Sequence, residues 1–195
     1  MPRRPTRTVP TVIVCGWEGS GPGHWQHWLA QQLTAAGRQV VVVELPDVDQ
    51  PRLHPWLAAL RSALAGLPPD GFDVVCHSLG AVLWLHHAST GPTTPRPARV
   101  ALVAPPSPAH DAEEIATFYP VPLKVDAVRA GAEGTVLVAG DDDPFLPEGI
   151  GEAYARPLKM AATLVPGGGH LNTDSGYGPW PAMLDWCGRD NLAFY

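Results

Sequence analysis

Three short strings in this sequence carry side chains that can cooperate in nucleophilic catalysis. In chain order they are Cys76-His77-Ser78-Leu79-Gly80, Gly140-Asp141-Asp142-Asp143-Pro144 and Gly167-Gly168-Gly169-His170. A serine hydroxyl is a weak nucleophile until a base removes its proton, and a histidine oriented by a carboxylate is a common base. The strings therefore predict a serine, an acid and a histidine that act together on an acyl group.

Ser78 is the candidate nucleophile. The apolar run Phe72 to Cys76 before it predicts a buried strand, and Leu79 to His87 after it predicts a helix. A sharp turn between a strand and a helix exposes a serine hydroxyl, and a small residue such as Gly80 lets the two elements pack closely. Cys76 stands where this turn usually has glycine, and it is the weaker candidate nucleophile because it ends the strand. A serine that only caps the helix is the structural alternative.

His170 is the candidate base. It follows the predicted strand Ala162 to Val165 through Pro166 and three glycines, a loop that can present an imidazole over the strand ends. An ordinary pKa near 6.5 suits proton transfer. A surface loop histidine is the alternative. The other histidines have weaker surroundings; His77 is expected to be a packed, hydrogen-bonded side chain. No pair of histidines stands with a carboxylate at metal-ligand spacing, so no metal is expected.

The candidate acid lies in the aspartate run after the predicted strand Thr135 to Ala139. We expect Asp143 to orient the imidazole, with Asp142 as the alternative and Asp141 as a solvated turn residue. Three aspartates in a row could also bind a divalent cation. However, Phe145 stands where a calcium loop needs an oxygen ligand, which disfavours that interpretation.

A glycine-rich loop, residues 16–21, follows the first predicted strand. It lacks both the glycine spacing and the lysine of nucleotide-binding loops. In a hydrolase, such a loop supplies one backbone N–H of the oxyanion hole, and the residue after the nucleophile supplies the other. These groups are assigned to Trp17 and Leu79. Trp25 and Trp180 are candidates for shaping a substrate pocket, with plain packing as an equal alternative.

Apolar runs alternate with helical patterns along the chain. The predicted strands are Thr11–Cys15, Val40–Leu45, Phe72–Cys76, Arg99–Val103, Thr135–Ala139 and Ala162–Val165. The predicted helices are His24–Ala36, Trp56–Leu67, Leu79–His87, Pro147–Ala155 and Pro181–Gly188. Because the strands are continuously apolar, both faces of the sheet should be covered. This pattern predicts an α/β fold: a doubly wound, mostly parallel sheet of about six strands in one domain, residues 1–195.

The longest connection, Ala104 to Gly134, has a possible helical stretch from Ala112 to Phe118. It is long enough to cover the site and too short for a large cap domain.

Composition excludes several classes of protein. A hydrophobic content of 45% and a charged content of 16% suit a globular chain. With a net charge of −6 there is no basic stripe for nucleic acid. No apolar run approaches the roughly 20 residues of a membrane span, and no signal peptide is recognisable, so a cytoplasmic protein is expected, with residues 1–8 as a flexible end. No C-x-x-C motif occurs, and reduced thiols are expected at Cys15, Cys76 and Cys187.

The chain resembles a family of small serine hydrolases that includes the bacterial YdeN-like proteins and the human retinoblastoma-binding protein nine. The matching strings are Gly19-Ser20-Gly21-Pro22-Gly23-His24-Trp25-Gln26, His77-Ser78-Leu79-Gly80, Asp142-Asp143-Pro144, Pro120-Val121-Pro122, Gly169-His170-Leu171-Asn172 and Ser175-Gly176-Tyr177-Gly178-Pro179-Trp180-Pro181. This resemblance implies a compact α/β-hydrolase fold without a large cap, with Ser78 as nucleophile, Asp143 as acid and His170 as base. Cys76 and the Trp17-Glu18 pair depart from the family pattern.

These observations together predict a serine hydrolase that needs no cofactor, acting on a small-molecule ester through an acyl-enzyme. An amidase or peptidase is the alternative within the class. A protein-binding scaffold that kept the fold without turnover is the alternative outside it. A third alternative is a hydrolase-fold enzyme of another reaction, such as a lyase or a cofactor-independent dioxygenase. No L-x-C-x-E string occurs, so the pocket-protein partner of the human relative does not carry over.

Overall fold

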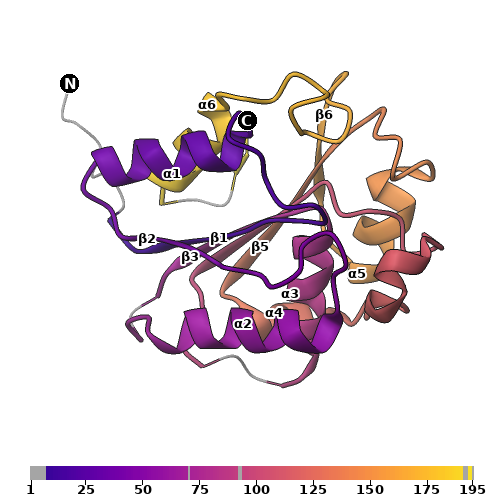
Figure 1. Ribbon diagram of the computed structural model, residues 1–195, viewed down its shortest axis with the longest axis horizontal. Helices are drawn as coiled ribbons and strands as arrows, with labels where there is room; N and C mark the ends of the chain where they lie inside the picture. Colours follow the sequence, from indigo (N-terminus) through magenta and orange to yellow (C-terminus); the bar gives the residue numbers. More distant parts are fainter. Residues whose placement is uncertain (1–7, 70, 92–93, 191–192, 195) are drawn as a thin grey trace.

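The structure is a computed structural model that describes residues 8–69, 71–91, 94–190 and 193–194. Its centre is a six-stranded, all-parallel sheet with the order β2-β1-β3-β4-β5-β6 (Figure 1). The strands are β1 (Thr11–Val14), β2 (Val40–Val42), β3 (Asp73–His77), β4 (Arg99–Val103), β5 (Gly134–Gly140) and β6 (Ala162–Val165). The predicted doubly wound sheet is confirmed. The end expected to be flexible lies outside the described residues, apart from Thr8.

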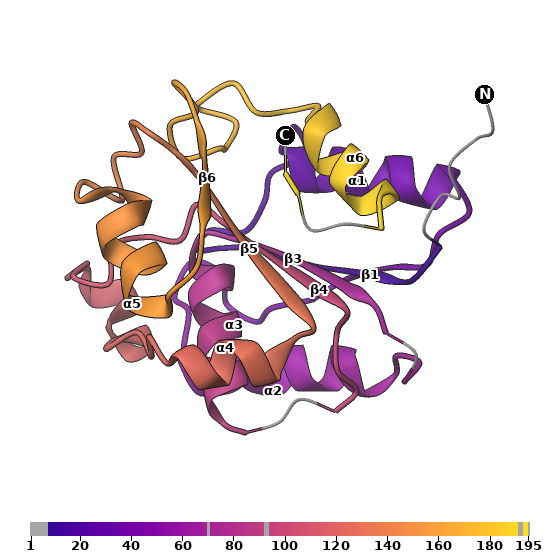
Figure 2. The ribbon, with the colours of Figure 1, turned by 180° about the vertical axis from the view of Figure 1, so that it is seen from behind.

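Helices cover both faces of this sheet (Figures 1 and 2). One face carries α1 (Trp25–Ala35) and α6 (Pro181–Gly188), and the other carries α2 (Leu53–Ala65), α3 (Leu79–Ser89) and α4 (Val125–Gly131). Successive strand residues point to opposite faces, so Val74 and Cys76 of β3 join the core under α3, whereas Val75 joins the core under α1. No helix in the described part of the chain is long and apolar enough to cross a membrane.

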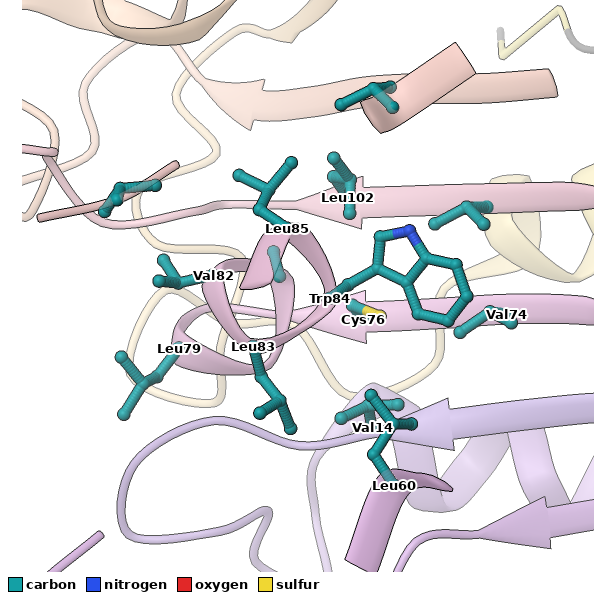
Figure 3. Close-up of a cluster of buried hydrophobic side chains, with 14 of the residues drawn as sticks. Val14, Leu60, Val74, Cys76, Leu79, Val82, Leu83, Trp84, Leu85 and Leu102 are labelled. Carbon is teal, nitrogen blue, oxygen red and sulfur yellow. The ribbon is translucent and has the colours of Figure 1, made fainter. Parts of the chain in front are cut away.

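Helix α3 is buried almost all round, which fixes the turn that precedes it. Leu79, Leu83 and Trp84 are each at most 1% exposed, and Figure 3 shows them packed with residues of β3 and α2. Burying one such side chain stabilises the fold by about 1.5–3 kcal/mol. The helix therefore holds its first residues in a rigid position at the end of β3.

The connection 104–134 contains more helix than the sequence pattern indicated. The stretch expected around Ala112 to Phe118 is a 3₁₀ helix, η1 (Glu113–Phe118). The pattern did not predict α4, because its seven residues are too few to show a helical repeat.

Two other helices differ from their predicted ranges. Helix α2 begins at Leu53, upstream of the predicted start, because Pro55 lies in the first turn, where its missing N–H needs no partner. The predicted helix over 147–155 contains a π-helical turn, η2 (Gly151–Ala155), followed by α5 (Arg156–Leu158). Pro157 has no N–H to continue the regular α-helical pattern there.

A buried ion pair ties the amino ends of the strands to α6. Asp73, at the start of β3, is 0% exposed and accepts two hydrogen bonds from Arg99, from Nε to Oδ1 (3.1 Å) and from Nη2 to Oδ2 (2.5 Å). Arg38 Nη2 lies 3.5 Å from the same carboxylate. Arg99 Nη1 also donates to the carbonyl of Trp186 in α6, at 3.0 Å. The pair is far from the carboxyl ends of the strands.

The strand order creates a crevice at the carboxyl ends of β1 and β3. The chain leaves β1 toward β2 and returns to place β3 on the other side of β1. In such sheets, the connections after the two central strands run to opposite faces and leave a ligand-binding crevice between them. The glycine-rich loop follows β1 and Ser78 follows β3, so both border this crevice.

Candidate active site

Ser78 occupies a strained turn between β3 and α3. Its φ of 54° and ψ of −126° lie in a region that side chains other than glycine rarely adopt. Two glycines allow the close packing around this turn. A Cβ at Gly80 would collide with the carbonyl oxygens of Val14 and Cys15, and one at Gly16 would lie 2.7 Å from Ser78 Cβ. The sequence therefore places the Ser78 hydroxyl at the tip of a tight turn.

Ser78, His170 and Asp143 form a continuous chain of hydrogen bonds. His170 Nε2 lies 2.9 Å from Ser78 Oγ, and His170 Nδ1 lies 2.9 and 3.0 Å from the two carboxylate oxygens of Asp143. Because Nδ1 faces a carboxylate, the neutral ring carries its proton there, which leaves Nε2 as an acceptor for the hydroxyl. Asp143 and His170 are 5% and 7% exposed, so the contact between them is largely shielded from water.

The two neighbouring aspartates hold the loop that carries His170. Asp142 Oδ1 accepts the N–H of Gly169 at 2.7 Å, and Asp141 Oδ1 accepts the N–H of Gly167 at 2.8 Å. The expectation that Asp141 is only a solvated turn residue was incomplete, since it anchors the loop although it is exposed. Sequence reasoning missed both anchors, and the one available signal was three adjacent carboxylates before a glycine loop.

His77 connects the turn at Ser78 to the same loop. Its Nε2 lies 2.9 Å from the backbone oxygen of His170, and burial lowers the pKa of His77 well below the ordinary value. The ring is therefore neutral and Nε2 donates the hydrogen bond. The predicted packed, hydrogen-bonded role of His77 agrees with this geometry.

Trp25 and Trp180 pack in the core, which is the alternative that the sequence left open to a role in shaping the substrate pocket. Trp25 is 0% exposed and donates from Nε1 to the carbonyl of Leu171 at 2.7 Å. Trp180 packs edge-on against Trp25, with ring centroids 5.0 Å apart. Both tryptophans therefore lie in the core beneath the His170 loop and not on the cavity at Ser78. The first turn of α1 faces the sheet, which directs the Trp25 ring inward.

A cavity of about 420 Å³ opens over Ser78 and His170. Trp17 and Leu79 both line it. Within the described residues, no hydrogen bond uses the Trp17 N–H. Leu79 is the first residue of α3, where a backbone N–H has no partner inside the helix. Among the described residues, two that line the cavity thus have backbone N–H groups without a hydrogen-bond partner.

The geometry of the site supports neither a cysteine nucleophile at Cys76 nor a metal site among the described residues. Cys76 is fully buried under α3, and burial raises the pKa of its thiol, so it is unavailable as a nucleophile. Among the residues that the structure describes, no three His, Cys, Asp or Glu side chains gather in a way that could hold a metal ion.

A match to the serine hydrolase family spans residues 11–188, which includes every strand and the whole crevice. The chain belongs to the serine hydrolase family. The resemblance inferred from the sequence motifs is thereby confirmed, and the chemistry of the site is that of a hydrolase.

Relatives of this serine hydrolase share its length as well as its fold. YdeN of Bacillus subtilis (strain 168), a protein named as a hydrolase, is 27% identical over 181 residues, which cover 91% of this chain and 94% of YdeN. The YdeN crystal structure superposes with a TM-score of 0.76 at 25% identity, covering 91% of this chain and 96% of YdeN. The crystal structure of a YdeN-like hydrolase from Pectobacterium atrosepticum superposes with a TM-score of 0.75 at 23% identity, covering 92% of this chain and 89% of that protein.

One more distant structure shares the fold alone. It comes from Nitrososphaera gargenis, is described as a carboxylesterase, and has a TM-score of 0.63 at 16% identity, with 84% of each chain covered. These structures establish the α/β-hydrolase fold of the chain.

Proposed function

We propose that this serine hydrolase is a carboxylesterase that cleaves small esters through an acyl-enzyme on Ser78. The observation that carries this proposal is the chain of hydrogen bonds from Ser78 Oγ through His170 to Asp143. Ser78 and His170 line a cavity, so the nucleophile and the base are accessible to a substrate. It provides a nucleophile, a base within reach of its proton and an acid that holds the base.

In the first half of the reaction, Ser78 Oγ attacks the ester carbonyl carbon while His170 Nε2 takes the hydroxyl proton. The N–H groups of Trp17 and Leu79 stabilise the oxyanion that forms. Asp143 keeps the Nδ1 proton in place and stabilises the positively charged ring. The imidazolium then protonates the leaving alkoxide, the carbon–oxygen bond breaks, and the alcohol departs.

In the second half, water attacks the Ser78 ester. His170 Nε2 takes a proton from this water, the second oxyanion occupies the same two N–H groups, and Ser78 leaves as its protonated form. A carboxylic acid is released and the enzyme is restored. Every proton is moved by His170, so no cofactor is needed.

Esters are preferred over amides in this proposal because an alkoxide leaves more readily than an amine. An amidase or peptidase would use the same three side chains. A scaffold without turnover would need neither the strained Ser78 turn nor the shielded Asp143.

The test is covalent labelling with a fluorophosphonate, read by mass spectrometry of the intact and digested protein. We expect one adduct, on Ser78, which is absent from Ser78→Ala and much slower in His170→Ala. Ester and amide panels with matched acyl groups then follow. No adduct on the folded protein would overturn the proposed function and favour the scaffold. An adduct with turnover of amides alone would replace the esterase with an amidase.

A further inference from the structure

His24 lies at the end of the glycine-rich loop and caps the amino end of α1. Its Nδ1 accepts the backbone N–H of Gln26 at 3.2 Å. Burial, with smaller contributions from His27 and His170, lowers the pKa of His24 to about 4, so the ring is neutral at pH 7. A neutral imidazole whose Nδ1 accepts a hydrogen bond carries its proton on Nε2. His24 is therefore a hydrogen-bond donor at Nε2.

Within the part of the chain that the structure describes, this donor has no hydrogen-bond partner. His24 is 5% exposed, and no hydrogen bond to its Nε2 exists among the described residues. His24 Nε2 is not one of the described side-chain atoms that are both unpaired and fully shielded from solvent. Because it has no partner among those residues, it must keep some solvent-accessible surface. The residue lines the cavity over Ser78 and His170. The cavity is therefore where Nε2–H can find an acceptor.

The cavity has two chemically different walls. One wall is polar and comes from the start of α1 and the His170 loop, where His24, Thr173 and Asp174 line it. The other comes from the connection 104–134 and the loop after β5; Pro106, Ile115 and Phe145 give it a mainly apolar surface, and His110 is its one polar residue among those that line the cavity. Phe145 is 44% exposed and rests on the His170 ring, with centroids 4.6 Å apart.

The charge of the lining restricts the polar half further. Glu18 and Asp174 are exposed carboxylates on the cavity, and among the described residues no lysine or arginine lines it. An anionic group would meet two like charges and no counter-charge. A group with a neutral acceptor oxygen, in contrast, can take the Nε2–H of His24.

We propose that the substrate is an ester that joins an apolar group to an uncharged polar group, and that His24 Nε2–H donates a hydrogen bond to an oxygen of the polar group. This inference rests on the proposed esterase function and names its substrate class. His24 contacts the substrate away from the reacting carbon and takes no proton.

The experiment uses pairs of esters that have equal numbers of heavy atoms. The first pair, butyl and 2-methoxyethyl hexanoate, places an ether oxygen in the alcohol. The second pair, butyl hexanoate and butyl 4-methoxybutanoate, places it in the acyl group. We expect the wild-type protein to favour the ether in one pair by about three- to tenfold in kcat/KM, the contribution of one neutral hydrogen bond.

Variants of His24 separate substrate binding from support of the fold. His24→Asn keeps an acceptor for the cap of α1, because asparagine is a favoured N-cap residue, but its side chain is too short to carry a donor to the position of Nε2. It should abolish the ether preference, so that kcat/KM for the two members of the pair becomes equal within about twofold. His24→Gln, whose amide N–H reaches further, should restore part of the preference.

His27→Asn is the matched control, since His27 lies on the exposed side of α1, outside this cavity. It should leave the ether preference unchanged. If His24→Asn lowers kcat/KM equally for both esters of a pair, the proposal is overturned and His24 only supports the fold. No ether preference in either pair would overturn it as well. If the wild type hydrolyses none of these esters, the esterase function itself fails, which is a different result from activity without preference.

Discussion

His77 donates a hydrogen bond from Nε2 to the backbone oxygen of His170 across 2.9 Å, although the two residues are 93 positions apart. His77 directly precedes Ser78. The His77 side chain therefore sets the position of the loop that carries His170 relative to the turn that carries Ser78. It is a neutral donor because burial keeps the pKa of His77 well below the ordinary value.

Replacing His77 should reduce turnover through the position of His170. His77→Leu occupies much of the same space but leaves the His170 carbonyl without its hydrogen-bond donor, so we expect kcat to fall about tenfold or more. His77→Gln can donate from its amide and should recover most of kcat. The measurement is kcat and KM for one ester, with thermal unfolding of each variant. A Leu variant with wild-type kcat would show that the hydrogen bond does not position the base.

The acid should be separable from its neighbour by substitution with asparagine. Asp143→Asn offers an amide N–H to His170 Nδ1 and favours the wrong tautomer, so kcat should fall about 10⁴-fold. Asp142→Asn keeps an oxygen that can accept the Gly169 N–H, and its loss should be about tenfold or less. Both variants are compared on the same ester. Equal losses would mean that Asp143 is not the acid, or that both aspartates serve only the loop.

Protonation of His87 should destabilise the protein in acid. Both ring nitrogens are buried without a partner among the described residues, and burial, followed by the charge of Arg61, lowers the pKa of His87 to about 4 from 6.5. Between these values the unfolded chain binds a proton that the folded chain does not, so stability is fully present above pH 6.5 and falls as pH decreases to 4. The expected loss is about 3 kcal/mol.

His87→Leu tests this loss, because His24 and His77 remain in both proteins and their contributions cancel in the comparison. Urea unfolding at pH 7 and pH 4 should show a decrease that is about 3 kcal/mol smaller in the variant. The same decrease in both proteins would mean that His87 is not the group that titrates.

Removing the charge of Asp73 should destabilise the fold without touching the cavity. Asp73→Asn leaves the buried guanidinium groups of Arg38 and Arg99 facing a neutral amide, at an expected cost of about 3–5 kcal/mol of unfolding free energy. The exposed pair of Glu152 and Arg156 is the control, and Glu152→Gln should cost less than about 1 kcal/mol. If chemical denaturation shows similar losses of unfolding free energy for Asp73→Asn and Glu152→Gln, burial does not determine how much an ion pair contributes to stability.

Much of the fold was predictable because its signals are local. Every predicted strand exists, and Arg99–Val103 and Ala162–Val165 have the predicted bounds. Continuous apolar runs indicated a sheet covered on both faces, and α4 was missed because it is too short to show periodicity. That residues 1–195 form one domain stays a prediction.

The residue types, their order and the elements that carry them can be read from local patterns: a serine between a strand and a helix, aspartates after a strand, and a histidine after glycines. Which of these groups meet depends on the three-dimensional path of the chain. The order of the strands and the paths of the loops after β1, β5 and β6 bring His170 to Asp143 and place His24 on the cavity, while Trp25 turns inward. These contacts join residues far apart in the chain, and no local pattern of side chains specifies them.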